Sequence, residues 1–585
     1  MTNPQSSKSE RLSRSAFDIL TVGVSALFLA LPMLVYGPMV KGDDTYEHLN
    51  YCRHFAEQFW AGEWYPRWLL NINHGLGSPT FFVYPPFGGY VYALLQPFGR
   101  ALHFNPFNAG EFLALFASGI CAWLWARTFA QRKAAVVGAI LYMLIPYHLA
   151  EDFYRRTALS ECWALAWMPL VLYFTSGVIS RKRFALLGLA VAYALLITSH
   201  LVSVLIFSSI PLALVIVMAS RGDKGRSFRR IVAGMALGTG LSCFYFVPAL
   251  SQAAHFPVLR ALCPPYYYLE SNLIGIRDIV GSGMRSRYVH WIALATVSTL
   301  AFIAICGGSV LWRGRPESRR QIAFWLGVCV LPAFLMSTLS LPLWSPKLLL
   351  FQGVQYPWRF NVILCLAAIF MGATFLSAIP RFWGPGRAVM LGILLLLVLS
   401  WLVSYGQIWS HYRTDTYTPN PRQLVSDDDG WFDSWTAPGV SQASALKASA
   451  EPRVRFIEGS GASQVRLWKA RDIEFDTDSS TGGWVEVNQF YYPKWTASAL
   501  GTSQPLQIDT ATPEGLVKIW VPAGHQQIRL AIPVQPAERI GRWISFASIL
   551  LCGILGWRER SAYLPGVLSR SQVDSPRNNL EGMPA

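Results

Sequence analysis

The sequence predicts a polytopic α-helical membrane protein with about twelve spans and a C-terminal β-sandwich domain outside the membrane. Of its 585 residues, 53% are hydrophobic and only 14% are charged, whereas a soluble domain carries about 25% charged residues. Apolar runs of about 20 residues recur, each long enough to cross a hydrocarbon core of about 30 Å. Beyond residue 450, polar and apolar residues alternate in short runs separated by Pro, Gly and Asp, which is typical of strands in a sandwich.

Basic residues mark the cytoplasmic loops, because such loops carry an excess of Lys and Arg. Short basic clusters separate the apolar runs, so the net charge of +16 indicates topology and argues against nucleic-acid binding. Both ends are expected in the cytoplasm. The predicted spans lie near residues 17–37, 108–126, 134–149, 161–180, 184–200, 202–219, 231–250, 290–311, 321–340, 359–379, 387–408 and 541–557.

These spans divide the chain into parts of different character. The transmembrane domain covers 1–408, and its first outer loop covers 38–107. Within that loop, the apolar segment 81–98 is expected to be re-entrant or interfacial, because a full crossing would place the Arg132-Lys133 cluster outside. The other parts are an outer β-rich domain at 409–540 with an irregular connection at 414–450, the last span at 541–557, and a cytoplasmic tail at 558–585 that is expected to be disordered.

Two carboxylates, Asp43 and Asp44, stand just past the first span, at the head of the first outer loop. Two interpretations fit them. An Asp before a helix caps free N–H groups, and the segment after Asp44 has an apolar stripe at helical spacing. One Asp suffices for a cap, so the second remains available as a general base. His48 lies four residues after Asp44, on a neighbouring helix face.

Other outer segments hold further candidates. Residues 150–160 are predicted as a second outer loop, either solvated or facing the first loop in a functional cluster. Arg359 lies at the outer end of a span, against the usual charge bias, where it can snorkel or grip a phosphate. His200 falls at an outer turn, where a lone His is more often part of a structural hydrogen-bond network than of a functional site. Cys52 and Cys263, both outside, can pair. The second loop contributes Glu151, Asp152, Arg155, Arg156 and Glu161.

Aromatic side chains are dense in two segments of the first outer loop, 62–68 and 81–87. Trp and Tyr are enriched at the headgroup level of membranes. An interfacial aromatic belt is therefore the expected role of most of these residues, although aromatic faces also stack on sugars.

Several motifs resemble known membrane families. An acidic first outer loop, a second acid-containing loop, many spans and an outer β-domain together resemble type-C (GT-C) glycosyltransferases. More narrowly, four segments resemble the bacterial membrane family labelled 6-pyruvoyl-tetrahydropterin synthase-related. The C-terminal segments 490–495 and 521–525 resemble the outer domain of YfhO-type proteins. The four family segments are Gly42-Asp43-Asp44 with His48 and Arg53, Tyr65-Pro66-Arg67-Trp68, Tyr154 to Glu161, and Tyr356-Pro357-Trp358-Arg359-Phe360.

The resemblance implies an inverting glycosyltransferase of the cytoplasmic (inner) membrane, acting on its outer face. A sugar would pass from a polyprenyl-phosphate donor to a glycan or lipid acceptor, with Asp43, or failing that Asp44, as base. Arg156 and Arg359, with Arg155, would bind the donor phosphate. The resemblance leaves a divalent cation open, and the family label is set aside as evidence of pterin chemistry because no zinc-binding His triad is present. Residues for positioning the substrates would be Glu151, Asp152, His48, His200, Glu161 and Tyr356.

Two other classes remain open beside the enzyme: a transporter or flippase of lipid-linked glycans, and a non-catalytic envelope assembly factor. A transporter needs polar groups within its spans near the midplane. In this sequence nearly all ionisable residues fall at span ends or in loops, which favours an enzyme at the outer interface.

Overall fold

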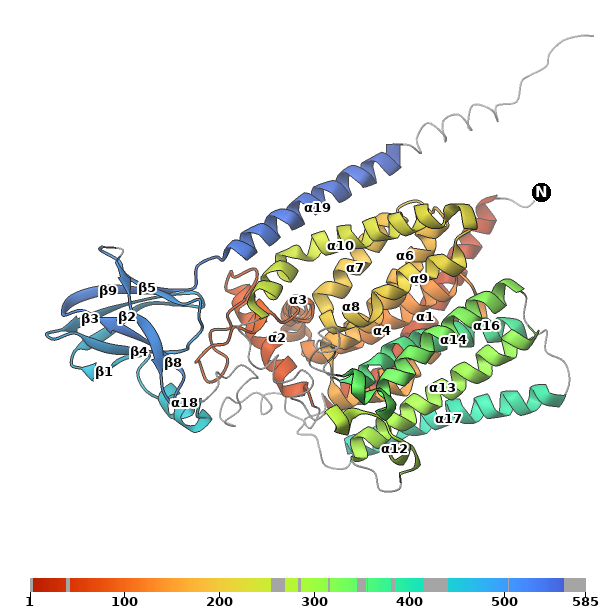
Figure 1. Cartoon of the computed structure of the whole chain (residues 1–585), viewed down its shortest axis with the longest axis horizontal. Helices are drawn as coiled ribbons and strands as arrows, with labels where there is room; N and C mark the ends of the chain where they lie inside the picture. Colours follow the sequence, from red (N-terminus) through yellow and green to blue (C-terminus); the bar gives the residue numbers. More distant parts are fainter. Residues whose placement is uncertain are drawn as a thin grey trace, which may run out of the picture.

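The chain forms a bundle of long helices with a β-domain at one end (Figure 1). The computed structural model describes residues 4–37, 43–253, 269–281, 286–313, 316–344, 354, 356–379, 385–413, 440–502 and 504–561. The N-terminus lies at the opposite end of the bundle from the β-domain, and helix α19 runs from the β-domain back toward the N-terminal end. This arrangement agrees with a topology in which both termini share one side.

Eleven helical segments of the described chain are long and apolar enough to cross a membrane. The twelfth predicted span, 184–200, is helix α7 and has 15 residues, shorter than the roughly 20 of an untilted span. The multi-pass prediction is therefore confirmed. The helices that make up the eleven segments and α7 are α1 Pro4–Tyr36, α4 Pro106–Ala126, α5 Arg132–Leu144, α6 Leu159–Ile179, α7 Ala185–Ser199, α8 Leu201–Phe207, α9 Ser209–Met218, α10 Lys224–Gln252, α13 Arg287–Arg313, α14 Pro316–Met336, α16 Asn361–Ala378, α17 Pro385–Arg413 and α19 Pro536–Ser561.

Shorter helices form most of the described segments between the candidate spans. Segment 81–98 contributes to helix α3, which has 16 residues and is not among the eleven candidate spans. The remaining short elements are α2 Thr45–Trp60, α12 Ile276–Val280, α18 Gln442–Ser449, the π-helix η2 Tyr147–Arg156, and the 3₁₀ turns η1 Thr80–Phe82, η3 Arg221–Asp223, η5 Leu269–Asn272, η6 Thr338–Leu343 and η7 Pro357–Phe360.

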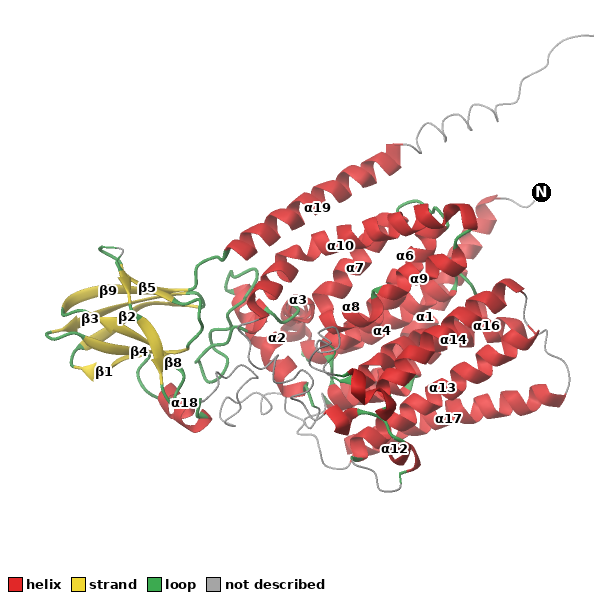
Figure 2. Cartoon of the chain, viewed as in Figure 1, coloured by secondary structure: helices red, strands yellow, loops and turns green. Residues whose placement is uncertain are grey.

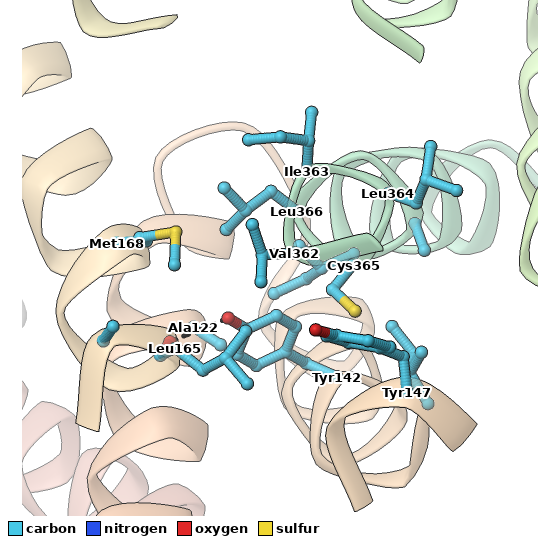
Figure 3. Close-up of a cluster of buried hydrophobic side chains, with 14 of the residues drawn as sticks. Ala122, Tyr142, Tyr147, Leu165, Met168, Val362, Ile363, Leu364, Cys365 and Leu366 are labelled. Atoms are coloured by element: carbon cyan, nitrogen blue, oxygen red, sulfur yellow. Dashed lines mark hydrogen bonds between the residues drawn. The ribbon is translucent and has the colours of Figure 1, made fainter. Parts of the chain in front are cut away.

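Helix α16 lies at the centre of the bundle. Its side chains are buried all around the helix, as expected for a helix that is apolar on every face. Val362 and Cys365 pack near Tyr142 and Tyr147 of the neighbouring α5–η2 segment (Figure 3). The π-helix η2, which carries several charged residues, is therefore packed against the core of the bundle.

The C-terminal domain is a sandwich of two antiparallel sheets (Figure 2). One sheet has the strand order β1-β4-β8-β7 and the other has the order β2-β3-β9-β5-β6. Val485, Val487, Ile519, Ile528 and Leu530 lie between the sheets with no exposed surface. The strands are β1 Val454–Gly459, β2 Ala462–Lys469, β3 Asp472–Ser479, β4 Gly483–Phe490, β5 Thr496–Ala499, β6 Pro505–Leu506, β7 Ile508–Ala511, β8 Leu516–Val521 and β9 Gly524–Ala531.

The first outer loop docks the β-domain onto the bundle. Trp68 is fully buried in the sandwich core, and its indole donates to Gln489 at 2.8 Å. Arg67 forms a buried ion pair at 3.1 Å with Glu538 at the start of α19, which also pairs with Arg471 at 2.9 Å. The β-domain is thus joined to the membrane domain by buried polar contacts as well as by the chain.

Four sequence predictions need correction or fall outside the described residues. The expected aromatic belt is wrong for Trp68, Phe81 and Phe82, which are buried because they pack against the β-domain and α2 rather than the membrane surface. The irregular connection is wrong at α18, which is helical. Residues 414–439, the tail from 562, and Cys263, hence its pairing with the buried Cys52, lie outside the described part.

Candidate active site

The π-helix η2 carries the charges that the sequence assigns to a second outer loop. It continues directly from α5 and ends at Thr157, whose backbone is left-handed with φ of 53°. Glu151, Asp152 and Arg156 are buried, so the prediction of a loop is wrong at 150–156. π-helical turns are rare and occur frequently at functional sites. The apolar residues of η2, among them Leu149 and Phe153, pack in the core of the bundle.

Arg156 binds three carboxylates from three elements. Its guanidinium contacts Asp44 at 3.1 Å, Asp152 at 2.8 Å and Glu161 at 2.9 Å. Such charge-assisted bonds are strong when they are desolvated, and Arg156 has only 5% of its side chain exposed. Arg156 therefore links α2, η2 and α6 into one charged cluster, which we call the Arg156 cluster.

Two further side chains complete the Arg156 cluster around Glu161. Arg359 approaches Glu161 at 3.5 Å, and the Tyr147 hydroxyl donates to the same carboxylate at 2.9 Å. Tyr356 and Trp358 stack with ring centroids 4.7 Å apart, over Arg359 and Arg156 respectively. The η7 turn thus packs against the Arg156 cluster.

The two aspartates of the first outer loop have different surroundings. Asp44 precedes helix α2, yet its side chain makes no capping hydrogen bond, because it turns to Arg156 instead. The capping interpretation is therefore wrong for Asp44. Asp43 is exposed to a cavity. Partial loss of hydration raises the pKa of Asp43, which Arg155 lowers and the neighbouring Asp44 raises again.

His48 joins the start of α2 to the end of η2. Since a carbonyl only accepts, His48 Nδ1 carries the hydrogen and donates to the Thr157 carbonyl at 2.8 Å. His48 Nε2 then accepts from the Tyr84 hydroxyl at 2.6 Å, and that oxygen accepts from Ser160 at 2.9 Å. The amides of Asp43 and Asp44 also donate to the carbonyls of η2, at 3.3 and 3.0 Å. Both aspartates are therefore positioned by backbone contacts to η2, and His48 ties the start of α2 to the end of the same helix.

The burial of His48 makes the stability of the folded protein sensitive to acid. Burial lowers the pKa of His48 below its ordinary value of 6.5, against the opposing effect of Asp44. Below pH 6.5 the unfolded state takes up a proton that folded His48 resists, so stability falls as pH falls through this window. We expect the melting temperature to drop between pH 7.5 and 5.5, and to drop less in His48→Gln, which has no titrating ring. Equal pH slopes in the two proteins would contradict this assignment.

A cavity of about 990 Å³ opens beside η2. Its polar end contains Asp43, Glu151, Arg155 and Arg287. The Tyr288 hydroxyl donates to Glu151 at 2.6 Å, and the guanidinium of Arg155 lies 4.1 Å from the centre of the Tyr288 ring. These contacts fix the two charged η2 residues that face the cavity.

The remaining cavity wall descends along two helices. Side chains of α13 and α17 line it from Arg287 to Ser298 and from Ile408 to Ser400. Eleven residues of helix rise about 16 Å, roughly half the thickness of a hydrocarbon core. Trp291, Leu294 and Val403 on this wall retain 46%, 38% and 61% exposure. The cavity therefore joins a charged end to an apolar groove between α13 and α17.

The predicted site residues thus divide into two groups. Asp43, Glu151 and Arg155 line the cavity. Asp44, Asp152, Arg156, Glu161 and Arg359 form the Arg156 cluster behind it, with Tyr356 stacked upon it. His200 lies close enough to Glu161 and Arg359 to interact with both charges, and its Nδ1 is 2.8 Å from Ser203 Oγ. Arg287 and Tyr288 were missed, although a cation at the outer end of a span, the signal that identified Arg359, applies equally to Arg287.

The carboxylates give no support to a divalent cation in this part of the site. Three of them converge on the Arg156 guanidinium, which supplies the positive charge at that point. Among the described residues, no group of three His, Cys, Asp or Glu side chains is arranged to hold a metal ion. No step proposed below therefore uses a metal.

The sequence matches a family model over residues 81–410, more than half of the chain. The model describes a 6-pyruvoyl-tetrahydropterin synthase related domain of membrane proteins. The chain belongs to this membrane protein family, as its motifs predict. The matched region contains η2, Arg287 and Arg359, whereas Asp43 and Asp44 precede it. No curated protein matches the chain.

Solved structures show only distant similarity. The arabinofuranosyltransferase AftD from Mycobacteria matches 67% of the chain with 18% identity and a TM-score of 0.41. Two Archaeoglobus fulgidus oligosaccharyltransferase structures match with 12% identity: one with Zn and sulfate, over 69% of the chain at 0.41, and AglB with an inhibitory peptide and a dolichol-phosphate, over 74% at 0.40. The chain covers 27% of AftD and 54% and 59% of the two archaeal chains.

Proposed function

We propose that the protein is a GT-C-like glycosyltransferase that takes a sugar from a polyprenyl phosphate at the outer face of the cytoplasmic membrane. One observation carries the proposal: a single cavity joins two carboxylates and two cations to an apolar groove within the membrane domain. A polyprenyl phosphate sugar has the same order of parts, with a polar head and an apolar tail.

The groove suits the lipid part of the donor. Its walls on α13 and α17 are largely apolar and exposed, and it reaches about halfway through the hydrocarbon core. Within this groove a polyprenyl chain would replace lipid contacts at little cost. The phosphate would then lie at the level of Arg155 and Arg287.

The polar end suits the transfer step. Asp43 accepts the proton of an acceptor hydroxyl as that oxygen bonds to the anomeric carbon. The bond from this carbon to the phosphate oxygen breaks, and its electron pair leaves with the phosphate. Arg155 and Arg287 stabilise the developing negative charge, which fixed cationic donors do effectively in a site of low dielectric. Attack opposite to the leaving phosphate inverts the anomeric centre.

The Arg156 cluster has a supporting role in this proposal. Arg156 already binds three carboxylates, and Arg359 shares Glu161. We therefore assign the phosphate to Arg155 and Arg287 rather than to Arg156 and Arg359. Arg156 and Arg359 instead fix the elements that carry Asp43 and Arg155.

Binding of polyprenyl phosphate tests the phosphate site without requiring knowledge of the sugar. We expect Arg287→Ala to weaken binding about 10- to 100-fold, because a hydrogen bond to a charged group contributes about 1.5–3 kcal/mol. Arg277→Ala, on the neighbouring helix α12 and away from the cavity walls, is the matched control and should bind as the wild type does. Equal affinity in wild type and Arg287→Ala would exclude this site.

Transfer itself is tested with purified protein in nanodiscs and a panel of lipid-phosphate sugars. Appearance of a glycosylated acceptor with release of polyprenyl phosphate supports the enzyme. Movement of the lipid-linked sugar between leaflets without bond cleavage would identify a flippase instead. Neither reaction with any donor would favour a non-catalytic assembly factor.

A further inference from the structure

The outer face of the sheet β1-β4-β8-β7 carries an aromatic pair. Trp484 on β4 lies directly opposite Trp520 on β8, and their ring centroids are 5.6 Å apart at 73°. Trp520 is 43% exposed, which is unusual for the largest apolar side chain. Packing between neighbouring strands accounts for the pair but not for this exposure.

A row of charged residues crosses the sheet two residues further along. Arg455, Glu486, Lys518 and Asp509 lie opposite one another in register on the four strands. Arg455 binds Glu486 at 2.7 Å, and Lys518 approaches Asp509 at 3.5 Å. The two positive and two negative charges of these four residues cancel, and Glu451 also approaches Arg455, at 3.4 Å. Because Glu486 is only 2% exposed, the donors and acceptors that the row offers are those of Arg455, Lys518 and Asp509.

The other sheet of the sandwich shows what an ordinary solvated face looks like in the same domain. Its outward positions on β3 are acidic and pair with arginines of the neighbouring strands: Arg529 on β9 binds Asp472 at 2.6 Å, and Arg466 on β2 binds Asp476 at 2.6 Å. Trp468 on β2 is its counterpart to the aromatic pair, but it is only partly exposed and packs against the domain core. The solvated face of this sheet thus carries no tryptophan as exposed as Trp520, so the exposure of Trp520 needs a separate explanation.

The aromatic pair lies at the end of the sheet away from the membrane domain. The other end of β4 is docked, since the Phe490 amide donates to the Leu76 carbonyl and Gln489 donates to the Gly75 carbonyl at 2.7 Å. Helix α18 covers that end, where Asn488 donates to the Ala448 carbonyl at 3.0 Å. From Gln489 to Trp484 the strand rises about 17 Å. The open part of the face therefore begins at the charged row and ends at the tryptophans.

We propose that the Trp484–Trp520 pair and the adjacent charged row form a binding face for a neutral glycan. The flat apolar rings match the C–H faces of pyranose rings, as aromatic groups match other flat apolar surfaces. The neutral row of donors and acceptors matches sugar hydroxyls, which carry no charge. The face deepens the proposed transfer by naming a glycan as acceptor class, yet it binds without catalysis and is tested separately.

The test measures binding of three neutral linear hexasaccharides, maltohexaose, cellohexaose and mannohexaose, to the full chain in nanodiscs, which avoids sugar-based detergents. We expect at least one to bind, and Trp520→Ala to weaken it at least about tenfold, as truncation of an aromatic anchor does in interfaces. Asp509→Asn, at an exposed position of the row, should weaken it without disturbing the fold. Trp468→Ala is the matched control on the other sheet and should bind normally.

Three results would overturn the proposal: no binding by any of the three hexasaccharides, unchanged affinity in both Trp520→Ala and Asp509→Asn, or equal loss in Trp468→Ala. Because Asp43→Asn leaves this face intact, it should keep full glycan affinity even where transfer is lost. Failure of the glycan face and failure of the transfer reaction are therefore distinguishable.

Discussion

Asp43→Asn is expected to abolish sugar transfer while leaving the protein folded. Removal of a general base lowers the rate typically about 10²- to 10⁴-fold, and Asp43 is the first-loop carboxylate that faces the cavity. Asparagine has the same size and keeps the backbone contacts of the first loop to η2. The measurement is the initial rate of transfer beside the melting temperature of each variant.

Asp44→Asn is the matched control, one residue along the same loop. Asp44 binds Arg156 at 3.1 Å, so its loss should lower the melting temperature and reduce transfer less than loss of Asp43 does. Full transfer in both variants would remove the base from the first loop. A larger loss in Asp44→Asn at unchanged stability would exchange the two roles.

The pH profile gives the same assignment a second test. Partial desolvation raises the pKa of Asp43 above its ordinary value of 3.8. A general base acts only when deprotonated, so transfer should decline with acid at a pH higher than an ordinary Asp would give.

Arg156→Met should have the largest effect on stability. It leaves Asp44, Asp152 and Glu161 without the guanidinium that now binds all three. Breaking a buried ion pair by removing one partner costs about 3–5 kcal/mol, and here three partners are affected. We expect a large fall in the denaturant midpoint of the detergent-solubilised protein.

Two variants separate this effect from a general loss of charge. Arg156→Lys keeps the charge but not the planar fork of donors, so it should be intermediate. Arg53→Met removes a cation whose side chain is 37% exposed and pairs with Glu57 at 3.0 Å, and exposed pairs contribute at most about 1 kcal/mol. A similar midpoint for Arg156→Met and Arg53→Met would contradict a structural Arg156 cluster.

The fold was predictable from the sequence because its signals are local. Apolar length and flanking charge mark each span, and period-two alternation marks the strands of the sandwich. The docking of the β-domain was not predictable in this way. Tyr65-Pro66-Arg67-Trp68 has the composition of an interfacial belt, and only the tertiary structure shows Trp68 inside the sandwich core and Arg67 beside Glu538.

The sequence indicated several residues of the proposed site, but neither Arg287 nor the arrangement of the site. Sequence spacing brought Asp43, Glu151 and Arg155 to attention, and the structure places all three on one cavity. The sequence alone could not separate Arg155 from Arg156, which are adjacent in the chain but face different ways on a π-helix. α-helical spacing does not apply there, and a single residue decides between cavity and cluster.

The most direct test of the proposed transfer site is a density map of the protein in nanodiscs with a bound polyprenyl phosphate. The phosphate should lie within hydrogen-bonding distance of Arg155 and Arg287, with Asp43 nearby and the lipid chain between α13 and α17. A phosphate bound at the opposite end of the bundle, near the N-terminus, or a lipid chain outside the α13–α17 groove, would contradict it.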